Sequence, residues 1–214
     1  PTITPYGMAA LLPHRKLTVQ ERTNGTLAVL ADEMSTDMPN RDKVLKAANP
    51  NSVALQYKNI IGMKRAERSE LVKGMDIVYI YHDKIDEAAH TSDSMVFPAC
   101  DDAIGEIKNM VRIIVNEFGG TSILITADHG FLYTYSPLAE DGKVDKTSFN
   151  QHDVEYGRRY AIMQKGTKPD YLLPVKFLDG NTGFEAFAPR ESVRIKMNGG
   201  GLNFVHGGIS LQEM

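Results

Sequence analysis

The sequence has 214 residues, of which 42% are hydrophobic, and this is enough for one large domain with a buried core. With 24 basic and 27 acidic residues the chain has no bulk attraction to nucleic acid, and its single cysteine, Cys100, excludes an internal disulfide and a cysteine-based zinc cluster. No stretch reaches the roughly 18 apolar residues of a membrane span, and no secretion signal is recognisable, so the cytoplasm is the expected location.

Residues 75–81 are β-branched and aromatic, which predicts a strand that ends at His82 and Asp83. Asp86 and His90 follow, four positions apart. If this stretch is helical, the two side chains lie one turn apart on one face, a spacing that suits one metal ion. The alternative is an ordinary pair of an acid and an imidazole on a solvated surface.

A long amphipathic helix is predicted next, with Asp101 or Asp102 as N-cap and Gly119-Gly120 as its end. Its apolar residues recur at steps of three and four, namely Ile104, Ile107, Val111, Ile114, Val115 and Phe118.

Within residues 121–127, Ile123, Leu124 and Ile125 are continuously apolar, which predicts a strand buried on both faces of a parallel sheet. Strand, helix and strand would form a βαβ unit, so we expect an α/β fold whose mostly parallel central sheet has helices on both faces. In such sheets, ligand-binding and catalytic residues lie at the carboxyl ends of the strands. Asp128, His129 and Gly130 stand at that position, and Asp with His suits zinc or manganese. Alternatively, Asp128 caps the next turn and His129 is merely partly buried.

Arginine and tyrosine gather at residues 156–160, where Arg158 and Arg159 could meet a phosphate or a nucleic-acid backbone, or pack on their neighbours. The polar segment 138–150 is expected to be a loop, and residues 172–178 and 192–196 are expected to be short strands.

The C-terminal segment 198–208 is rich in glycine and contains His206. Glycines permit close approach of the backbone to a ligand, but they also occur in plain flexible loops. Ser210 and Glu213 have the spacing of a capping box for a helix that has no room to form. Together with the start at Pro1, this leads us to expect a piece of a longer protein.

Three motifs in order resemble the metal scaffold of the alkaline phosphatase superfamily: Asp-x-x-x-His at 86–90, Asp-His-Gly at 128–130, and His-Gly-Gly at 206–208. Within this superfamily, the amino-acid sequences of segments 79–86, 125–133 and 205–210 are similar to those of the PglZ domain of BREX bacteriophage-exclusion systems. The resemblance spans almost the whole chain and implies a single PglZ domain over residues 1–214, in which the strand with the early metal-ligand Asp is missing.

The resemblance implies two divalent metal ions, with zinc the first choice and manganese or magnesium the alternatives. Asp86, His90 and His206 would hold one ion, and Asp128 and His129 the other, whose site would be incomplete without the early Asp. It also implies a nucleophile at the start of a helix, for which Thr4 before Pro5 is the choice and Thr2 the reserve. Alternatively, Thr4 only caps the helix.

The implied activity is that of a phosphatase or phosphodiesterase that works by two-metal phosphoryl transfer. The implied partners are a phosphoester substrate and other BREX proteins, with nucleic acid or nucleotide as further candidates and no membrane. The competing hypothesis is an inactive phosphatase-like scaffold within a BREX complex.

Overall fold

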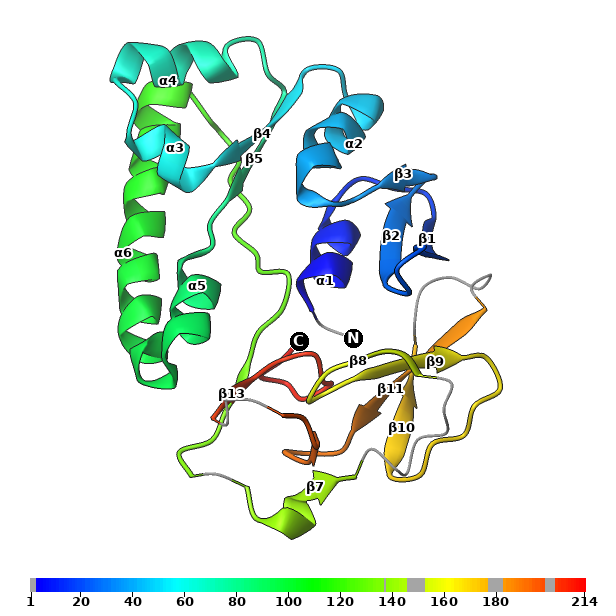
Figure 1. Cartoon of the computed structure of the whole chain (residues 1–214). Coiled ribbons are helices and arrows are strands. Elements are labelled where there is room, and N and C mark those ends of the chain that lie inside the picture. Colours follow the sequence, from blue (N-terminus) through cyan, green and yellow to red (C-terminus); the bar gives the residue numbers. More distant parts are fainter. Residues whose placement is uncertain (1–2, 137, 146–152, 177–182, 199–202) are drawn as a thin grey trace. The chain divides into compact units, whose positions relative to one another are not determined.

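The computed structural model describes residues 3–136, 138–145, 153–176, 183–198 and 203–214 (Figure 1). It divides into two compact units. The first unit combines Pro1–Asn40 with Ala127–Met214, and the second unit is Arg41–Thr126. The single domain expected from the sequence stays a prediction.

The first unit contains one α-helix and many short strands. Its elements are α1 (Thr4–Leu11), β1 (Leu17–Glu21), β2 (Leu27–Ala31), β3 (Met34–Ser35), η1 (Met38–Asn40), β6 (Leu132–Tyr133), η4 (Glu140–Gly142), β7 (Lys143–Val144), β8 (Asp153–Tyr156), β9 (Ala161–Gln164), β10 (Leu172–Val175), β11 (Phe184–Pro189), β12 (Arg194–Ile195) and β13 (Phe204–Val205).

The N-terminal part of this unit is a helix on a small antiparallel sheet of order β1-β2-β3. The tight turn between β1 and β2 contains Asn24 and Gly25, and Gly25 has a φ of +78°, which glycine adopts without strain. Helix α1 begins with Pro5 in its first turn, as expected, and buries Tyr6 and Ala9.

The largest sheet of the first unit has the antiparallel order β10-β11-β9-β8. Strands β7 and β12 pair in parallel beside it, so the expected loop 138–150 contains η4 and β7 in its described part. Both groups contribute to one apolar core, formed by Val144, Ala161, Met163, Leu172, Phe187 and Ile195. The expected strands at 172–178 and 192–196 appear as the shorter β10 and β12.

The second unit consists of α2 (Arg41–Ala48), β4 (Ser52–Gln56), α3 (Tyr57–Ile61), α4 (Arg65–Val72), β5 (Ile77–Tyr81), α5 (Lys84–Thr91), η2 (Asp93–Met95), α6 (Val96–Ile113) and the π-helical turn η3 (Ile114–Phe118).

Strand β5 confirms the prediction of a strand over residues 75–81, but its partner differs from the expected one. It pairs in parallel with β4, with Ser52 opposite Ile77 and Gln56 opposite Tyr81. The crossover between the two strands carries α3 and α4, so the βαβ unit lies one step earlier in the chain. The core of this unit is built around Ile60, Met110 and Ile113.

The predicted long helix is present, with a different start and partly different buried residues. It begins at Val96, before the expected N-cap, and its last turn ends at Gly119 in the left-handed conformation with φ of +69°. Ala103, Met110 and Ile113 are buried, whereas Ile104 and Val115 are exposed. Met110 and Ile113 belong to the core of this unit, and Ile114 and Phe118 of the predicted apolar face pack against it.

The prediction of a buried strand at 121–127 is wrong. These residues are not part of a sheet, and the side chain of Leu124 is 88% exposed. A strand requires a neighbouring strand to pair with its backbone N–H and C=O groups, and none of the described sheets includes residues 121–127. The chain therefore has α/β elements in small sheets, while the mostly parallel central sheet is not confirmed.

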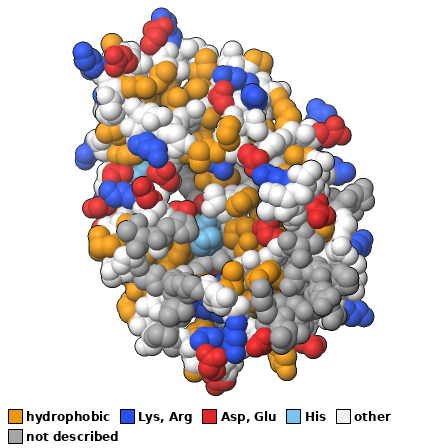
Figure 2. Space-filling model, in the orientation of Figure 1, with side chains coloured by type: hydrophobic (Ala, Val, Ile, Leu, Met, Phe, Trp, Pro, Cys, Tyr) orange, Lys and Arg blue, Asp and Glu red, His pale blue; other side chains and the backbone are white. Residues whose placement is uncertain are grey.

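Basic and acidic side chains are interspersed over the face shown in Figure 2, as expected for a chain with a net charge of −3. Within the described ranges, none of the helices has the length and apolar character needed to cross a membrane.

Candidate active site

His129 and His206 approach each other because of the pairing of β6 with β13. These strands are antiparallel, with Val205 opposite Leu132. His206 directly follows β13, and His129 stands shortly before β6, so the ladder places both at the same end. Their rings stack with a centroid distance of 4.3 Å and an interplanar angle of 8°.

Thr4 completes this cluster from the start of α1. Its Oγ1 lies 3.2 Å from Nε2 of His129. The other ring nitrogen, Nδ1, lies 2.9 Å from the carbonyl oxygen of Gly130. A carbonyl only accepts, so Nδ1 carries the hydrogen, and in the neutral imidazole the Nε2 lone pair faces the Thr4 hydroxyl. The carbonyl of Gly130 thus sets the tautomer of His129.

A glycine in α1 allows this approach. A Cβ on Gly7 would overlap with the backbone carbonyl of Asp128. Gly7 lies one turn after Thr4, so the helix can rest directly on Asp128 and bring the Thr4 hydroxyl to the neighbouring imidazole. The Asp128 carboxylate lies 3.6 Å from Nε2 of His129, and both side chains are largely buried.

The turn that carries His206 is anchored by a buried ion pair. Arg159 lies in the turn between β8 and β9, and its guanidinium meets the Glu213 carboxylate with two contacts of 2.8 Å. Neither side chain has solvent exposure. Glu213 also accepts hydrogen bonds from the backbone N–H of Gly208 and Ser210 and from the Ser210 hydroxyl, and the bond from the Ser210 N–H is one of the two bonds of a capping box.

The charge of Glu213 depends on this environment. Burial would raise the pKa of its carboxyl, but the hydrogen bond and the charge of Arg159, with the hydrogen bonds of Ser210, outweigh burial and hold the pKa below its usual value. The group therefore stays ionised in the folded chain and keeps its acceptor role.

Two further glycines are required by close contacts around this turn. A Cβ on Gly130 would overlap with the carbonyl oxygen of Gln212, and the Gly130 N–H donates to the Glu213 carbonyl at 2.9 Å. Gly207 has a φ of +104°, a conformation that residues with a side chain rarely adopt. The glycines of both histidine motifs therefore serve close packing in the described structure.

A buried polar group lies under α1. The Tyr160 hydroxyl donates to the Glu155 carboxylate at 3.0 Å. Burial raises the pKa of Glu155, although the hydrogen bond from Tyr160 opposes this. Burial also raises the pKa of Tyr6 on α1, with Glu155 and Tyr160 adding to the effect. The Tyr6 and Tyr160 hydroxyls therefore keep their protons at neutral pH.

The donor set of the cluster fits a divalent metal. Carboxylate and imidazole groups are the ligands that zinc and manganese take, and Asp128 lies beside His129, which stacks on His206. The hydrogen bond from Nδ1 to a carbonyl is the support that metal-bound imidazoles commonly have.

The other predicted ligands belong to the second unit. Helix α5 carries Asp86 and His90 one turn apart, so the expected helical spacing is confirmed. The side chain of His90 and the reserve nucleophile Thr2 lie outside the described residues. The role of Asp86 and His90 in a metal site stays a prediction.

Sequence reasoning missed the residues that position the site. Gly7 carries no signal beyond its place one turn after Thr4. Arg159 was part of a recognised arginine pair and Glu213 of a recognised capping box, but nothing in the sequence joined them over 54 positions.

Comparison with known proteins agrees with the motifs. The family model for the BREX system PglZ alkaline phosphatase-like domain matches residues 1–214. The chain is 34% identical to the alkaline phosphatase-like protein BrxZ of Escherichia coli O9:H4 (strain HS), and 31% identical to the alkaline phosphatase-like protein PglZ of Bacillus cereus (strain H3081.97). Both alignments cover 100% of this chain and 25% of the relative, so the chain spans about a quarter of their length. No solved structure matches. The chain therefore belongs to the PglZ family of alkaline phosphatase-like domains from BREX systems.

Proposed function

We propose that this chain carries part of the active site of a metal-dependent phosphoester hydrolase, a phosphatase or phosphodiesterase of a BREX defence system. Thr4 is the nucleophile in this proposal. The proposal includes two divalent ions, zinc first and manganese or magnesium as alternatives; Asp128, His129 and His206 of the first unit would be ligands, and Asp86 and His90 stay the ligands predicted from the family resemblance. The intact protein acts with other BREX proteins, to which its family relates it.

One observation carries the proposal, namely the 3.2 Å approach of Thr4 Oγ1 to His129 Nε2. These residues are 125 positions apart in the sequence, so their contact is a product of the fold. A threonine that only capped its helix would turn its oxygen toward backbone N–H groups of the first turn. The helix shows no side-chain capping bond, and Ile3 stands at the N-cap position.

The chain's own residues perform three tasks in this mechanism. The Thr4 oxygen attacks phosphorus as its hydroxyl proton passes to water, and the bond from phosphorus to the leaving oxygen breaks while that oxygen takes up a proton from water; a second water then adds its oxygen to phosphorus, and the bond to the Thr4 oxygen breaks and restores the hydroxyl. The N-terminal end of α1 places its positive partial charge beside the phosphoryl oxygens. Asp128, His129 and His206 fix the geometry around the reacting oxygen. The divalent ions, when bound, would supply charge neutralisation and lower the pKa of the Thr4 hydroxyl.

The test is hydrolysis of bis-p-nitrophenyl phosphate by the intact protein with added zinc or manganese, together with its metal content. Thr4→Val keeps the shape of the side chain and removes the hydroxyl, so we expect a loss of about a thousandfold or more in kcat. Thr4→Ser should retain measurable turnover. Thr23→Val is the matched control, because Thr23 is exposed in the first unit, and it should hydrolyse at the parental rate.

The metal roles are tested separately from the nucleophile. Asp128→Asn and His206→Ala should each lower the bound metal and the rate together. Full turnover of Thr4→Val would overturn the nucleophile assignment. A parent protein with neither metal nor hydrolysis would favour the scaffold alternative.

A further inference from the structure

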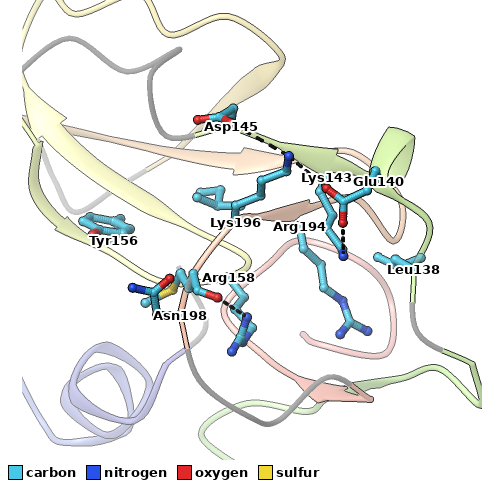
Figure 3. Close-up of a pocket in the computed structure, with 11 residues that line it drawn as sticks. Leu138, Glu140, Lys143, Asp145, Tyr156, Arg158, Arg194, Lys196 and Asn198 are labelled. Carbon is cyan, nitrogen blue, oxygen red and sulfur yellow. Dashed lines mark hydrogen bonds and ion pairs between the residues drawn. The ribbon is translucent and has the colours of Figure 1, made fainter.

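The first unit contains a second cluster of charged side chains, around the pair β7 and β12 (Figure 3). A pocket of about 630 Å³ is lined there by residues from η4, β7, β8, β12 and the turns beside them. The described residues include four cationic side chains and two carboxylates in its wall: Lys143, Arg158, Arg194, Lys196, Glu140 and Asp145. Basic and acidic side chains gather in the same place at the lower end of Figure 2.

The backbone that holds these charges is well supported. Parallel pairing puts Lys143 opposite Arg194 and Val144 opposite Ile195. Val144 and Ile195 belong to the buried core of the unit, so the backbone of the neighbouring residues Lys143 and Arg194 is held in place. Arg194 is only 4% exposed and donates to the Thr134 hydroxyl at 2.8 Å, which orients its guanidinium.

The carboxylates lie at the rim of the pocket. Glu140 accepts from Lys143 at 2.7 Å and from Lys196 at 2.9 Å, and the two lysines lower the pKa of its carboxyl to about 2. The Glu140 side chain is nevertheless 73% exposed. Ion pairs with an exposed carboxylate contribute little to stability, so a stronger anion can displace Glu140 from the lysines.

The lining also includes an aromatic ring, that of Tyr156 on β8, on the opposite side of Figure 3 from Leu138. Arg158 donates to the Met197 carbonyl at 3.4 Å. The side chains of Arg158 and Arg194 extend in the same direction in Figure 3. Planar guanidinium groups match phosphate oxygens, and an aromatic ring that lines the same pocket can stack on a base.

We propose that this pocket is a binding site for the phosphate of a nucleotide, with the base against Tyr156. The net charge of the lining is positive, and the volume is that of a site for a small organic ligand. The site is separate from Thr4, His129 and His206, so it needs neither a metal nor turnover, and it goes beyond the proposed hydrolase.

The test measures binding of AMP, inorganic phosphate and a five-nucleotide single strand of DNA to the intact protein by titration calorimetry. A chelator is present throughout to keep metal ions from the hydrolase site, and only the part of the AMP binding that a substitution in the pocket changes is assigned to the pocket. The double variant R158Q/K196Q should lose at least about tenfold in affinity for AMP, since each charge-assisted contact accounts for that order. Lys165→Gln is the matched control, because Lys165 is exposed on the same unit away from the pocket, and its affinity should stay within twofold.

A second variant works in the opposite direction. Glu140→Gln removes the exposed competitor from Lys143 and Lys196, so AMP should bind about two- to fivefold tighter. Glu140 is exposed and outside the core, so this variant should fold like the parent. It therefore tests the proposal even if the double variant R158Q/K196Q is unstable.

The outcomes separate the sources of the ligand. Equal affinity for AMP and the strand identifies a free nucleotide, and tighter binding of the strand identifies a nucleic-acid end; both support the proposal. Absence of AMP binding, equal affinities in all variants, or binding of an oligoglutamate peptide in place of AMP overturns it.

Discussion

Arg159 and Glu213 form a bidentate ion pair, with both contacts at 2.8 Å and both side chains fully buried. The pair joins the turn between β8 and β9 to the last turn of the chain. A buried ion pair is rarely more stabilising than apolar residues of the same volume, but it demands one geometry. Here that geometry holds the backbone beside His206, since Glu213 also accepts from the N–H groups of Gly208 and Ser210.

Arg159→Met should destabilise the first unit by about 3–5 kcal/mol, because it leaves the Glu213 carboxylate buried without its partner. The free energy of unfolding in urea measures this. Arg190→Met is the matched control, since Arg190 is exposed on the same unit, and its change should stay within about 0.5 kcal/mol. Equal effects of the two substitutions would show that the buried pair contributes no specific stability.

Stability should fall in acid because of Glu213. Its carboxyl has a folded pKa below the ordinary value of 4.5, so the unfolded chain takes up the proton first as the pH decreases. The contribution of the ionised Glu213 carboxylate to the free energy of unfolding is therefore present above pH 4.5 and is lost as the pH falls through the folded pKa. Unfolding free energies of the parent and of Glu213→Gln, measured between about pH 7 and pH 3, should converge in acid. Parallel curves would contradict the lowered pKa.

Gly7→Ala should disturb the candidate active site. The new methyl group would overlap with the Asp128 carbonyl, so α1 must move away and carry Thr4 from His129. We expect a loss of about 1–3 kcal/mol in stability, together with weaker metal binding. Gly105→Ala is the control, because Gly105 lies on α6 with open space around its Cα and should gain about 0.5–1 kcal/mol from helix propensity. A Gly7→Ala variant as stable as the parent would show that the close approach is unnecessary.

Leu124→Lys distinguishes the structure from the expected buried strand. Leu124 is 88% exposed, so in the 214-residue chain the substitution should change the stability by less than about 0.5 kcal/mol. Leu45→Lys places the same side chain at a position that is 2% exposed on α2, and several kcal/mol should be lost there. Comparable losses at both positions would show that residues 121–127 are packed after all.

Features that depend on neighbouring residues could be predicted from the sequence. Pro5 in the first turn of α1, the helix end at Gly119 and the turn of Ser210 with Glu213 were all expected and are present. Each is decided by contacts within about one turn of chain, so a few residues contain the whole pattern. The motifs around Asp128 and His206 likewise identified the family without any structure.

Only the tertiary structure decided which distant segments meet. The apolar run at 121–127 has the composition of a strand, yet a strand forms only where another one pairs with it, and β4 became the partner of β5 instead. The pairing of β6 with β13 brought His129 to His206. The fold also buries Arg159 in an ion pair, whereas its neighbour Arg158 lines a pocket. Sequence therefore determined the local turns, the helix ends and the chemistry of the side chains. The fold decided their partners, because long-range packing depends on the whole chain at once.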